Sequence, residues 1–279
     1  RNMKFDRRKI KDGVVYVIMM AALLAVIAVL ASMLFYIARQ AWPFFKPSLF
    51  SSNSEHGILP MLVTTVYLAL LSIVVALPVG VITAIYLNEY AKNNAPVRLL
   101  RLAIETLAAV PSIIYGLFGL LVFCRFFQLG QSILSGAFTL SIMILPVIIR
   151  TTEEALKTVP DSFREGSLSL GATKFQTIFY ITLPAALPGI ASSAILALGR
   201  VAGESAPVLL TVGIAKNLPR SIFDSGRTLT IHLYYLTKEA ISPEDFGTAF
   251  ASSAVLIVLV LCLNTAMRGI SARLGRLHV

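Results

Sequence analysis

Six stretches of the chain are apolar and long enough to cross a lipid bilayer as helices. A helix needs about 20 apolar residues to span the hydrocarbon, and charged side chains are rare within each stretch. The stretches are Val14–Ala38, Ile58–Leu87, Leu102–Cys124, Ile133–Ile149, Ala185–Gly213 and Phe246–Met267. The pattern therefore predicts an all-α integral membrane protein with six transmembrane helices.

Three of these spans contain residues that interrupt a regular apolar helix. The second is long and carries Pro78, so we expect it to be tilted or kinked. The third contains Glu105 and Pro111, and its apolar part is expected to begin after the glutamate. The fifth contains both Arg200 and Glu204, which makes it the most unusual of the six.

Composition supports the membrane assignment. Hydrophobic residues make up 57% of the 279, charged residues only 14%, and the mean hydropathy is +0.80. A water-soluble protein of this size could not bury so much apolar side chain in one core. The two cysteines, Cys124 and Cys262, lie in apolar segments, which favours buried thiols over a disulfide or a metal site.

The excess of basic residues predicts the orientation of the chain. The net charge of +10 could indicate nucleic-acid binding, but in a membrane protein the positions of Lys and Arg matter more. Of the 24 basic residues, 16 fall in the two tails and in the loops after the second and fourth spans. Only 7 fall on the opposite side, and Arg200 lies inside a span. Both termini are therefore predicted to be cytoplasmic, with the first span retained as an anchor.

Motifs of common enzymes are missing from the sequence. It contains no GxxxxGK[ST], HExxH, GxSxG or CxxC pattern, and none of the six spans contains an aspartate. The three histidines are scattered over loops and the C-terminal tail. A passage for a solute is therefore a more natural function than membrane catalysis.

The predicted cytoplasmic loop at residues 151–184 is the most informative segment. Asp161 or Ser162 is expected to cap a helix that ends at Gly171. Three residues at positions i, i+4 and i+7 would share one face of it: Phe163, Ser167 and Leu170. A second amphipathic run follows and continues to Pro184.

This loop resembles the EAA loop of permease subunits in binding-protein-dependent ABC importers. The family pattern is EAA, three residues, glycine, nine residues, isoleucine, one residue, Leu-Pro. The matching residues are Glu165, Gly166, Ser167, Gly171, Ile181, Leu183 and Pro184. Gly166 and Ser167 replace two alanines but are also small. The resemblance implies a coupling helix that docks on an ATPase subunit, a helix-in-groove contact. The alternative, a helix lying on the lipid surface, would need a more basic polar face.

Charges inside the fifth span are the second informative feature. An isolated charge in mid-bilayer costs from about 3 to over 10 kcal/mol, so Arg200 and Glu204 should face a protein interior or a wet cavity. Pro207 is expected to break the helix beside them. The Arg200 guanidinium could bind an anion while Glu204 neutralises it at rest, or the two could form a fixed structural ion pair. At the end of the fourth span, Arg150 with Glu153 or Glu154 could likewise bind an anion or form a structural ion pair.

Three further stretches of sequence make the family resemblance more specific. PVIIRTTEEAL, GRVAGESAP and PSIIYGLFG are similar to segments of PstA-type permeases of the bacterial phosphate ABC importer, and the similarity runs from Leu59 to Arg268. It implies a type I ABC importer permease fold. It also implies that Arg150, Glu153 and Arg200 are linked to phosphate passage, and Glu204 joins them by its place in the motif. Gly116 and Gly119 would serve helix contact or line the path.

The resemblance also implies the partners and location. The chain would be a transport subunit in the bacterial inner membrane, without an ATPase site or cofactor of its own. ATP and Mg would be bound by two cytoplasmic partner subunits, beside a second homologous permease and a periplasmic phosphate-binding protein. Residues 1–57 would form a basic tail, a peripheral first helix and a periplasmic loop, and residues 58–279 the permease core.

Other functions remain open from the residues alone. A permease of the same architecture could carry sulfate, molybdate or an amino acid, since only the family resemblance selects phosphate. A standalone channel or a membrane enzyme is more remote, because the coupling-type loop would then be unexplained. Similarly, the polar segment Ala215–Asp245 could be a docking surface or an inert loop.

Overall fold

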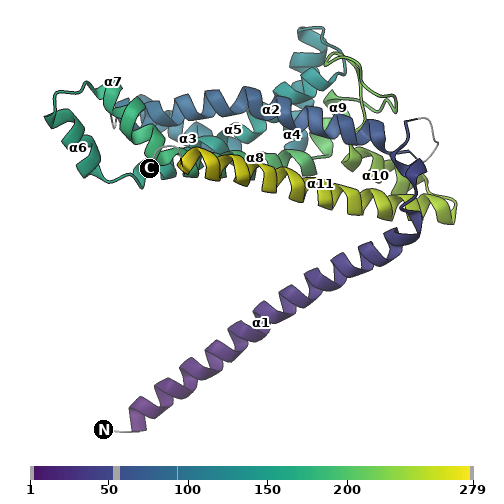
Figure 1. The fold of residues 1–279 in the computed structure, drawn as a ribbon, viewed down its shortest axis with the longest axis horizontal. Helices are drawn as coiled ribbons and strands as arrows, with labels where there is room; N and C mark the ends of the chain where they lie inside the picture. Colours follow the sequence, from purple (N-terminus) through teal and green to yellow (C-terminus); the bar gives the residue numbers. More distant parts are fainter. Residues whose placement is uncertain (1–2, 53–56, 93, 277–279) are drawn as a thin grey trace.

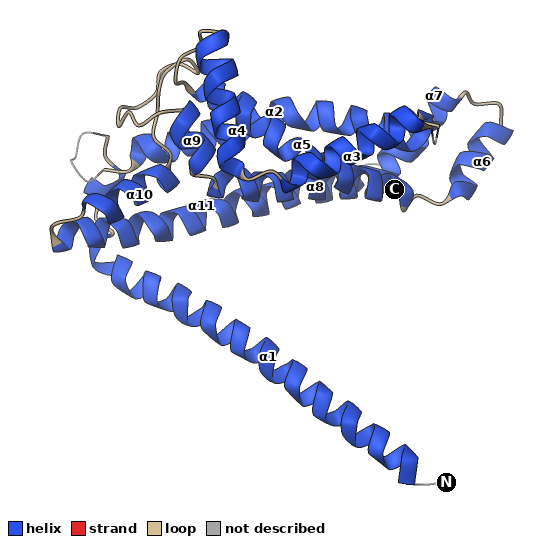
Figure 2. Cartoon of the chain, turned by 180° about the vertical axis from the view of Figure 1, so that it is seen from behind, coloured by secondary structure: helices blue, strands red, loops and turns tan. Residues whose placement is uncertain are grey.

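The computed structural model describes residues 3–52, 57–92 and 94–276, and these residues form helices and loops without a strand (Figure 2). The α-helices are α1 (Met3–Ala41), α2 (Leu59–Ile85), α3 (Ala95–Ala109), α4 (Ser112–Gly119), α5 (Ile133–Lys157), α6 (Asp161–Ser169), α7 (Lys174–Thr177), α8 (Leu183–Gly203), α9 (Ala206–Thr211), α10 (Leu229–Glu239) and α11 (Pro243–Arg276). Three π-helical turns, η3 (Tyr86–Tyr90), η4 (Leu120–Phe126) and η5 (Ile178–Thr182), continue α2, α4 and α7. Two short 3₁₀ turns, η1 (Trp42–Phe44) and η2 (Pro47–Phe50), follow α1.

Helix α5 packs against α2 and α8, and α11 packs against α8, so that these four helices form a bundle (Figure 1). Its buried residues Leu140, Ile144 and Ile148 recur every four positions, so they share the face that the neighbouring helices cover. Close approach is possible because small residues lie at the crossings: a side chain at Gly80 would strike Ile148. The bundle core is therefore a packed helix–helix interface.

Helix α1 lies outside this bundle. It diverges from the other helices (Figure 1), and no residue of its most apolar stretch is buried. Contact is confined to its C-terminal end, where the Tyr36 ring meets Phe250 edge-on with centroids 5.7 Å apart. The chain returns to the bundle through η1, whose Phe44 ring occupies the space beside Gly247.

The third predicted span, Leu102–Cys124, is wrong as a single helix. Helices α3 and α4 meet at an angle of 101°, and the break falls at Val110 and Pro111, both in extended conformation. Proline disfavours the helical conformation in the residue before it and lacks an N–H group, so the chain turns there. Within the described residues there are thus five helices long enough to cross a membrane, or six spans if the bent pair counts as one.

The fifth predicted span, Ala185–Gly213, also ends earlier than expected. Helix α8 stops at Gly203 because Glu204 is extended, with ψ at 138°, and α9 begins at Ala206. The expected break is present, but it precedes Pro207, which lies within the first turn of α9, where its missing N–H is tolerated. By contrast Pro78 and Pro146 lie inside continuous helices.

The two ends of the bundle differ. Helices α6 and α7 project as a hairpin at one end, which we call the hairpin end, and the C-terminal end of α11 lies on the same side (Figure 1). The loops around residues 212–228 lie at the opposite end, which we call the loop end. Helix α1 runs from the loop end back toward the side of the hairpin.

Candidate functional site

Arg200 and Glu204 lie at the break between α8 and α9. Their side chains approach to 3.7 Å, Nε to Oε1, which is an ion-pair contact longer than a charge-assisted hydrogen bond. The Arg200 side chain keeps 34% of its surface exposed and Glu204 keeps 17%. Among the described residues, no acceptor lies in hydrogen-bond geometry with the guanidinium. The pair is therefore loose and reachable.

Several uncharged groups surround this pair. Tyr115 of α4 lies within electrostatic range of Arg200, and its hydroxyl donates to the Leu107 carbonyl over 2.6 Å. The Glu204 carbonyl accepts a hydrogen bond from Thr230 of α10. On the other side Asn264 of α11 faces Gly199, and its Oδ1 is buried without a hydrogen bond. Helices α4, α10 and α11 thus converge on the α8–α9 break.

Gly116 explains how α4 comes so close to this break. A Cβ atom built on it would lie 2.6 Å from the Pro207 Cα, so only glycine allows this approach. Gly119, one turn further, is equally close to Thr139 of α5. The PSIIYGLFG segment therefore serves helix contact, one of the two uses expected for its glycines.

A second group of charges lies between α3 and α5, toward the hairpin end. Arg150 pairs with Glu105 at 2.8 Å, and Glu153 pairs with Arg101 at 2.8 Å. The predicted pairing of Arg150 with Glu153 or Glu154 along α5 is therefore wrong. Both residues instead point to a neighbouring helix, since the bend at Pro111 lays α3 beside this end of α5.

The two charged groups occupy different depths of the bundle. Helices α5 and α8 are antiparallel neighbours, and Gly189 touches Ala155. Arg150 is five residues from this contact and Arg200 eleven residues, in the same direction. At 1.5 Å per residue the two arginines therefore differ in depth by roughly 9 Å.

The hairpin matches the predicted coupling loop in its turn but not in its cap. Helix α6 ends in a turn where Gly171 has φ of +90° and donates to Leu168, which confirms the glycine as the C-terminal signal. At its start, however, Asp161 is the first helical residue, and Pro160 precedes it without a side-chain cap. Of the three residues expected to share one face, Ser167 is buried while Phe163 and Leu170 are exposed.

Residue Ser167 points inward because it joins the two arms of the hairpin. Its hydroxyl lies 2.9 Å from that of Thr177 in α7, and Thr173 closes a capping box with Gln176 at the start of α7. Gly166 has open space around it. Exposed residues on α6 and at its C-terminal end therefore include Glu165, Gly166 and Leu170.

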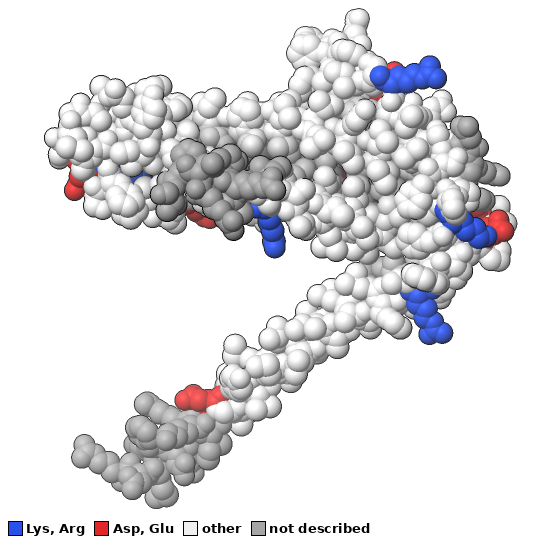
Figure 3. Space-filling model, in the orientation of Figure 1, with Lys and Arg blue, Asp and Glu red and all other residues white. Residues whose placement is uncertain are grey.

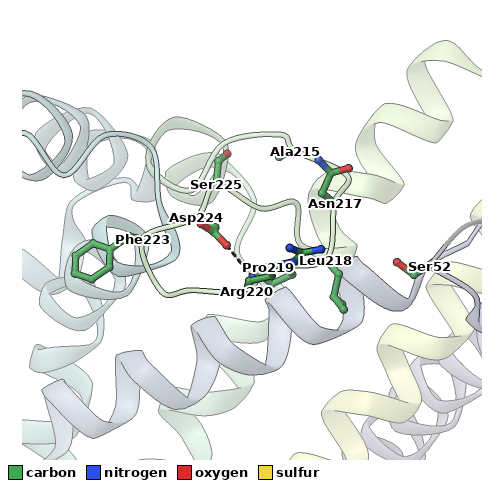
Figure 4. A pocket seen from close by; sticks show the side chains of 9 residues that line it. All are labelled: Ser52, Ala215, Asn217, Leu218, Pro219, Arg220, Phe223, Asp224 and Ser225. Carbon is green, nitrogen blue, oxygen red and sulfur yellow. Dashed lines mark hydrogen bonds between the residues drawn. The ribbon is translucent and has the colours of Figure 1, made fainter.

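The loop end holds a hollow of about 740 Å³ beside Arg220 and Asp224 (Figure 4). The Asp224 carboxylate accepts the backbone N–H groups of Arg220 and Ser221 over 2.8 and 2.9 Å, and these bonds lower its pKa. In the segment beyond it Arg227 is buried over the Tyr235 ring, and burial lowers its pKa.

Charged side chains are sparse elsewhere on the face shown in Figure 3. The described residues contain no group of three His, Cys, Asp or Glu side chains placed to hold a metal ion.

The sequence interpretation missed Arg101 as a partner of Glu153 and did not single out Asn264. Polar residues on the apolar faces of α3 and α11 were the available signal, but their partners lie on other helices.

The sequence is similar to those of several known transport proteins. Residues 76–276 match the family described as "Binding-protein-dependent transport system inner membrane component". A probable ABC transporter permease of Bacillus subtilis, YqgI, is 35% identical, covering 76% of each chain. The phosphate transport system permease PstA 1 of Mycobacterium tuberculosis is 32% identical, covering 97% of this chain and 92% of its own, and PstA of Mycobacterium leprae is 38% identical over 78% and 70%.

Solved structures agree on the fold. A chain of a bacterial alginate ABC transporter, in complex with an alginate-bound periplasmic protein, superposes with a TM-score of 0.72 at 15% identity and 99% coverage of both chains. The MetNI methionine transporter gives a TM-score of 0.57 at 22% identity, covering 80% of this chain and 94% of that one. With the six apolar segments, the hairpin and these relatives together, the chain belongs to the inner-membrane permease family of binding-protein-dependent ABC importers.

Proposed function

We propose that this chain moves inorganic phosphate from the periplasm to the cytoplasm as one permease subunit of an ATP-driven importer. The observation that carries the proposal is the loosely paired, partly exposed Arg200 at a helix break inside an apolar bundle. Relatives that cover most of the chain and are named phosphate transport permeases support the choice of anion.

The chemistry of Arg200 suits a transported anion. Its planar guanidinium offers several N–H donors that match two phosphate oxygens at once, and it stays charged at any physiological pH. Glu204 balances this charge while no anion is bound. An arriving phosphate would replace Glu204 as the partner, so binding exchanges one ion pair for another and remains weak enough to allow release.

Arg150 and Glu153 are proposed to act at the second depth, toward the hairpin end. Both are already held by α3 at 2.8 Å, through Glu105 and Arg101. A passing anion would have to compete with Glu105, the more exposed of the two glutamates, for Arg150. Phosphate would thus move between two arginines at different depths without chemical change.

Coupling to ATP is proposed to occur through the hairpin. The outer surface of α6 around Glu165, Gly166 and Leu170 would dock on a cytoplasmic ATP-binding subunit, and closure of two such subunits would drive alternation between outward and inward states. Ser167, Gly171 and the Ile181–Pro184 segment would shape the hairpin. In this proposal both termini lie in the cytoplasm, residues 1–57 form a peripheral arm and residues 58–279 form the core.

The experiment that tests this function is uptake by the reconstituted complex. We expect ATP-dependent accumulation of labelled phosphate in proteoliposomes that contain this chain, a second permease, two ATPase subunits and the binding protein, with sulfate not accumulated. Arg98→Gln, an exposed arginine one turn before Arg101, serves as the control that keeps uptake. Accumulation of sulfate, molybdate or an amino acid instead would assign another substrate, and movement without ATP would indicate a channel.

A further inference from the structure

The π-helical turn η3 at the end of α2 is one place where the hairpin is fastened to the bundle, besides the end of α5, where Arg164 donates to the Leu156 and Val159 carbonyls over 2.8 Å each. Arg164 of α6 reaches it directly, with Nη2 donating to Glu89 Oε1 over 3.2 Å. Lys174 of α7 donates to the Glu89 carbonyl and lies 5.0 Å above the Tyr90 ring. Both arms of the hairpin are therefore fastened to the same short turn.

The Glu89–Arg164 pair is well shielded from solvent. The Glu89 and Arg164 side chains keep only 9% and 17% of their surface exposed, whereas in each other ion pair of the described residues at least one side chain keeps 34% or more. Asn88 donates a further hydrogen bond to the same carboxylate oxygen over 2.9 Å. Shielded, multiply bonded pairs contribute more than exposed ones, because less solvent screens them.

On its other side η3 contacts the charged side chains that join α3 to α5. Arg101 of α3 donates to the Leu87 carbonyl over 2.9 Å while it pairs with Glu153 of α5. The Leu87 side chain is fully buried in an apolar cluster with Ile104 and Leu156. One turn of five residues thus joins the hairpin to the helix that carries Arg150.

We propose that Glu89, with Arg164 and Arg101, is the positioning linkage that transmits movement of the hairpin to the Arg150–Glu153 end of α5. The inference rests on the proposed function. A π-turn is a less stable form of helix that is often found at functional sites, and here its i to i+5 bond joins Ala91 to the Tyr86 carbonyl. A pull on Glu89 would therefore move Leu87, Arg101 and Glu153 together.

Substitution of Glu89 tests the linkage in the complete reconstituted complex. Glu89→Gln keeps the shape and the acceptor for Asn88 but removes the charge. We expect phosphate moved per ATP hydrolysed to fall about fivefold or more, the usual size of a coupling effect, while hydrolysis continues. Arg164→Gln should lose at least as much, because it also removes the hydrogen bonds to the Leu156 and Val159 carbonyls, and the double variant should lose no more than Arg164→Gln alone.

Asp161 supplies a matched control. Its carboxylate also contacts Arg164, at 2.8 Å, but it is 85% exposed and belongs to the hairpin itself. Asp161→Asn should therefore leave the transport ratio unchanged. An unchanged ratio in Glu89→Gln, or an equal loss in Asp161→Asn, would overturn the linkage.

A second measurement is independent of the substrate. Spin labels at Ser162 of α6 and Leu99 of α3, both exposed, report whether hairpin and α3 move as one body, once the two native cysteines are replaced. We expect the label distance to be the same with and without ATP in the parent complex and to change with ATP in Glu89→Gln. If the label distance responds to ATP in the same way in the parent complex and in Glu89→Gln, the linkage is overturned. A complex that shows the expected label behaviour but moves no phosphate would overturn only the substrate assignment.

Discussion

The two charged regions of the bundle look alike in sequence but differ in structure. Arg150 and Glu153 are each held at 2.8 Å by a residue of another helix, whereas Arg200 and Glu204 face each other at 3.7 Å within one segment. The first arrangement fastens helices, since each pair joins α3 to α5. The second leaves guanidinium donors available.

This difference teaches that an intramembrane arginine is not by itself a binding site. What matters is how completely its donors are used in the folded protein, because an anion can only bind donors that are free or weakly held. By this criterion the α8–α9 break is the site where phosphate is proposed to bind, and the α3–α5 charges are first of all a fastening that transport would have to adjust.

The largest expected effect is that of Arg200→Gln. Loss of a charged donor set typically costs about 1.5–3 kcal/mol, which corresponds to roughly tenfold or more in binding. We expect phosphate uptake to fall at least tenfold while the complex still assembles, as measured by labelled uptake and by co-purification of the partner subunits. Normal uptake by this variant would remove Arg200 from the pathway.

Arg101→Gln is expected to act mainly on stability. It leaves Glu153, which is buried, without its cation, and loss of such a partner costs about 1–3 kcal/mol. A lower midpoint in thermal unfolding of the detergent-solubilised complex is the measurement. Arg98→Gln on the same helix is the control. Equal midpoints for both variants would show that the α3–α5 charges do not fasten the helices.

Two glycines near the α8–α9 break provide a smaller, paired test. Gly116→Ala places a Cβ 2.6 Å from the Pro207 Cα, so the break must shift, at a cost of about 1–3 kcal/mol. Gly199→Ala meets nothing nearer than Asn264 at 3.9 Å and should be neutral or slightly stabilising in helix α8. Thermal unfolding and uptake distinguish them, and equal loss in both would contradict the packing assigned to α4 and α9.

The smallest effect concerns acid at the loop end. The pKa of Asp224 is lowered in the folded chain, so its contribution is fully present above the ordinary aspartate pKa of about 3.9 and is lost as pH falls through the lowered value. We expect the Arg220 and Ser221 amides to stay protected from hydrogen exchange between pH 5 and 8 and to lose protection only in acid. Asp224→Asn should remove this acid dependence. If the amides of Asp224→Asn lose protection in acid as the parent does, the role assigned to the Asp224 carboxylate is wrong.

Local signals in the sequence predicted much of the fold. The apolar stretches located the long helices, and Gly171 marked the end of α6, because hydropathy and a left-handed turn are properties of a few adjacent residues. The partners of Arg150, Glu153 and Arg164 were not predictable in this way. They depend on the 101° bend that lays α3 against α5 and on the π-turn of η3, neither of which has a unique local signature.

Helix α1 has a consequence for how the sequence can change over time. The family match begins at residue 76, after α1, and α1 touches the bundle only through its last residues. A helix whose sides meet no fixed neighbour within its own chain has to keep its length and hydropathy but not its individual side chains. Substitutions among apolar residues should therefore accumulate faster in α1 than in α5, where each side chain has a defined neighbour.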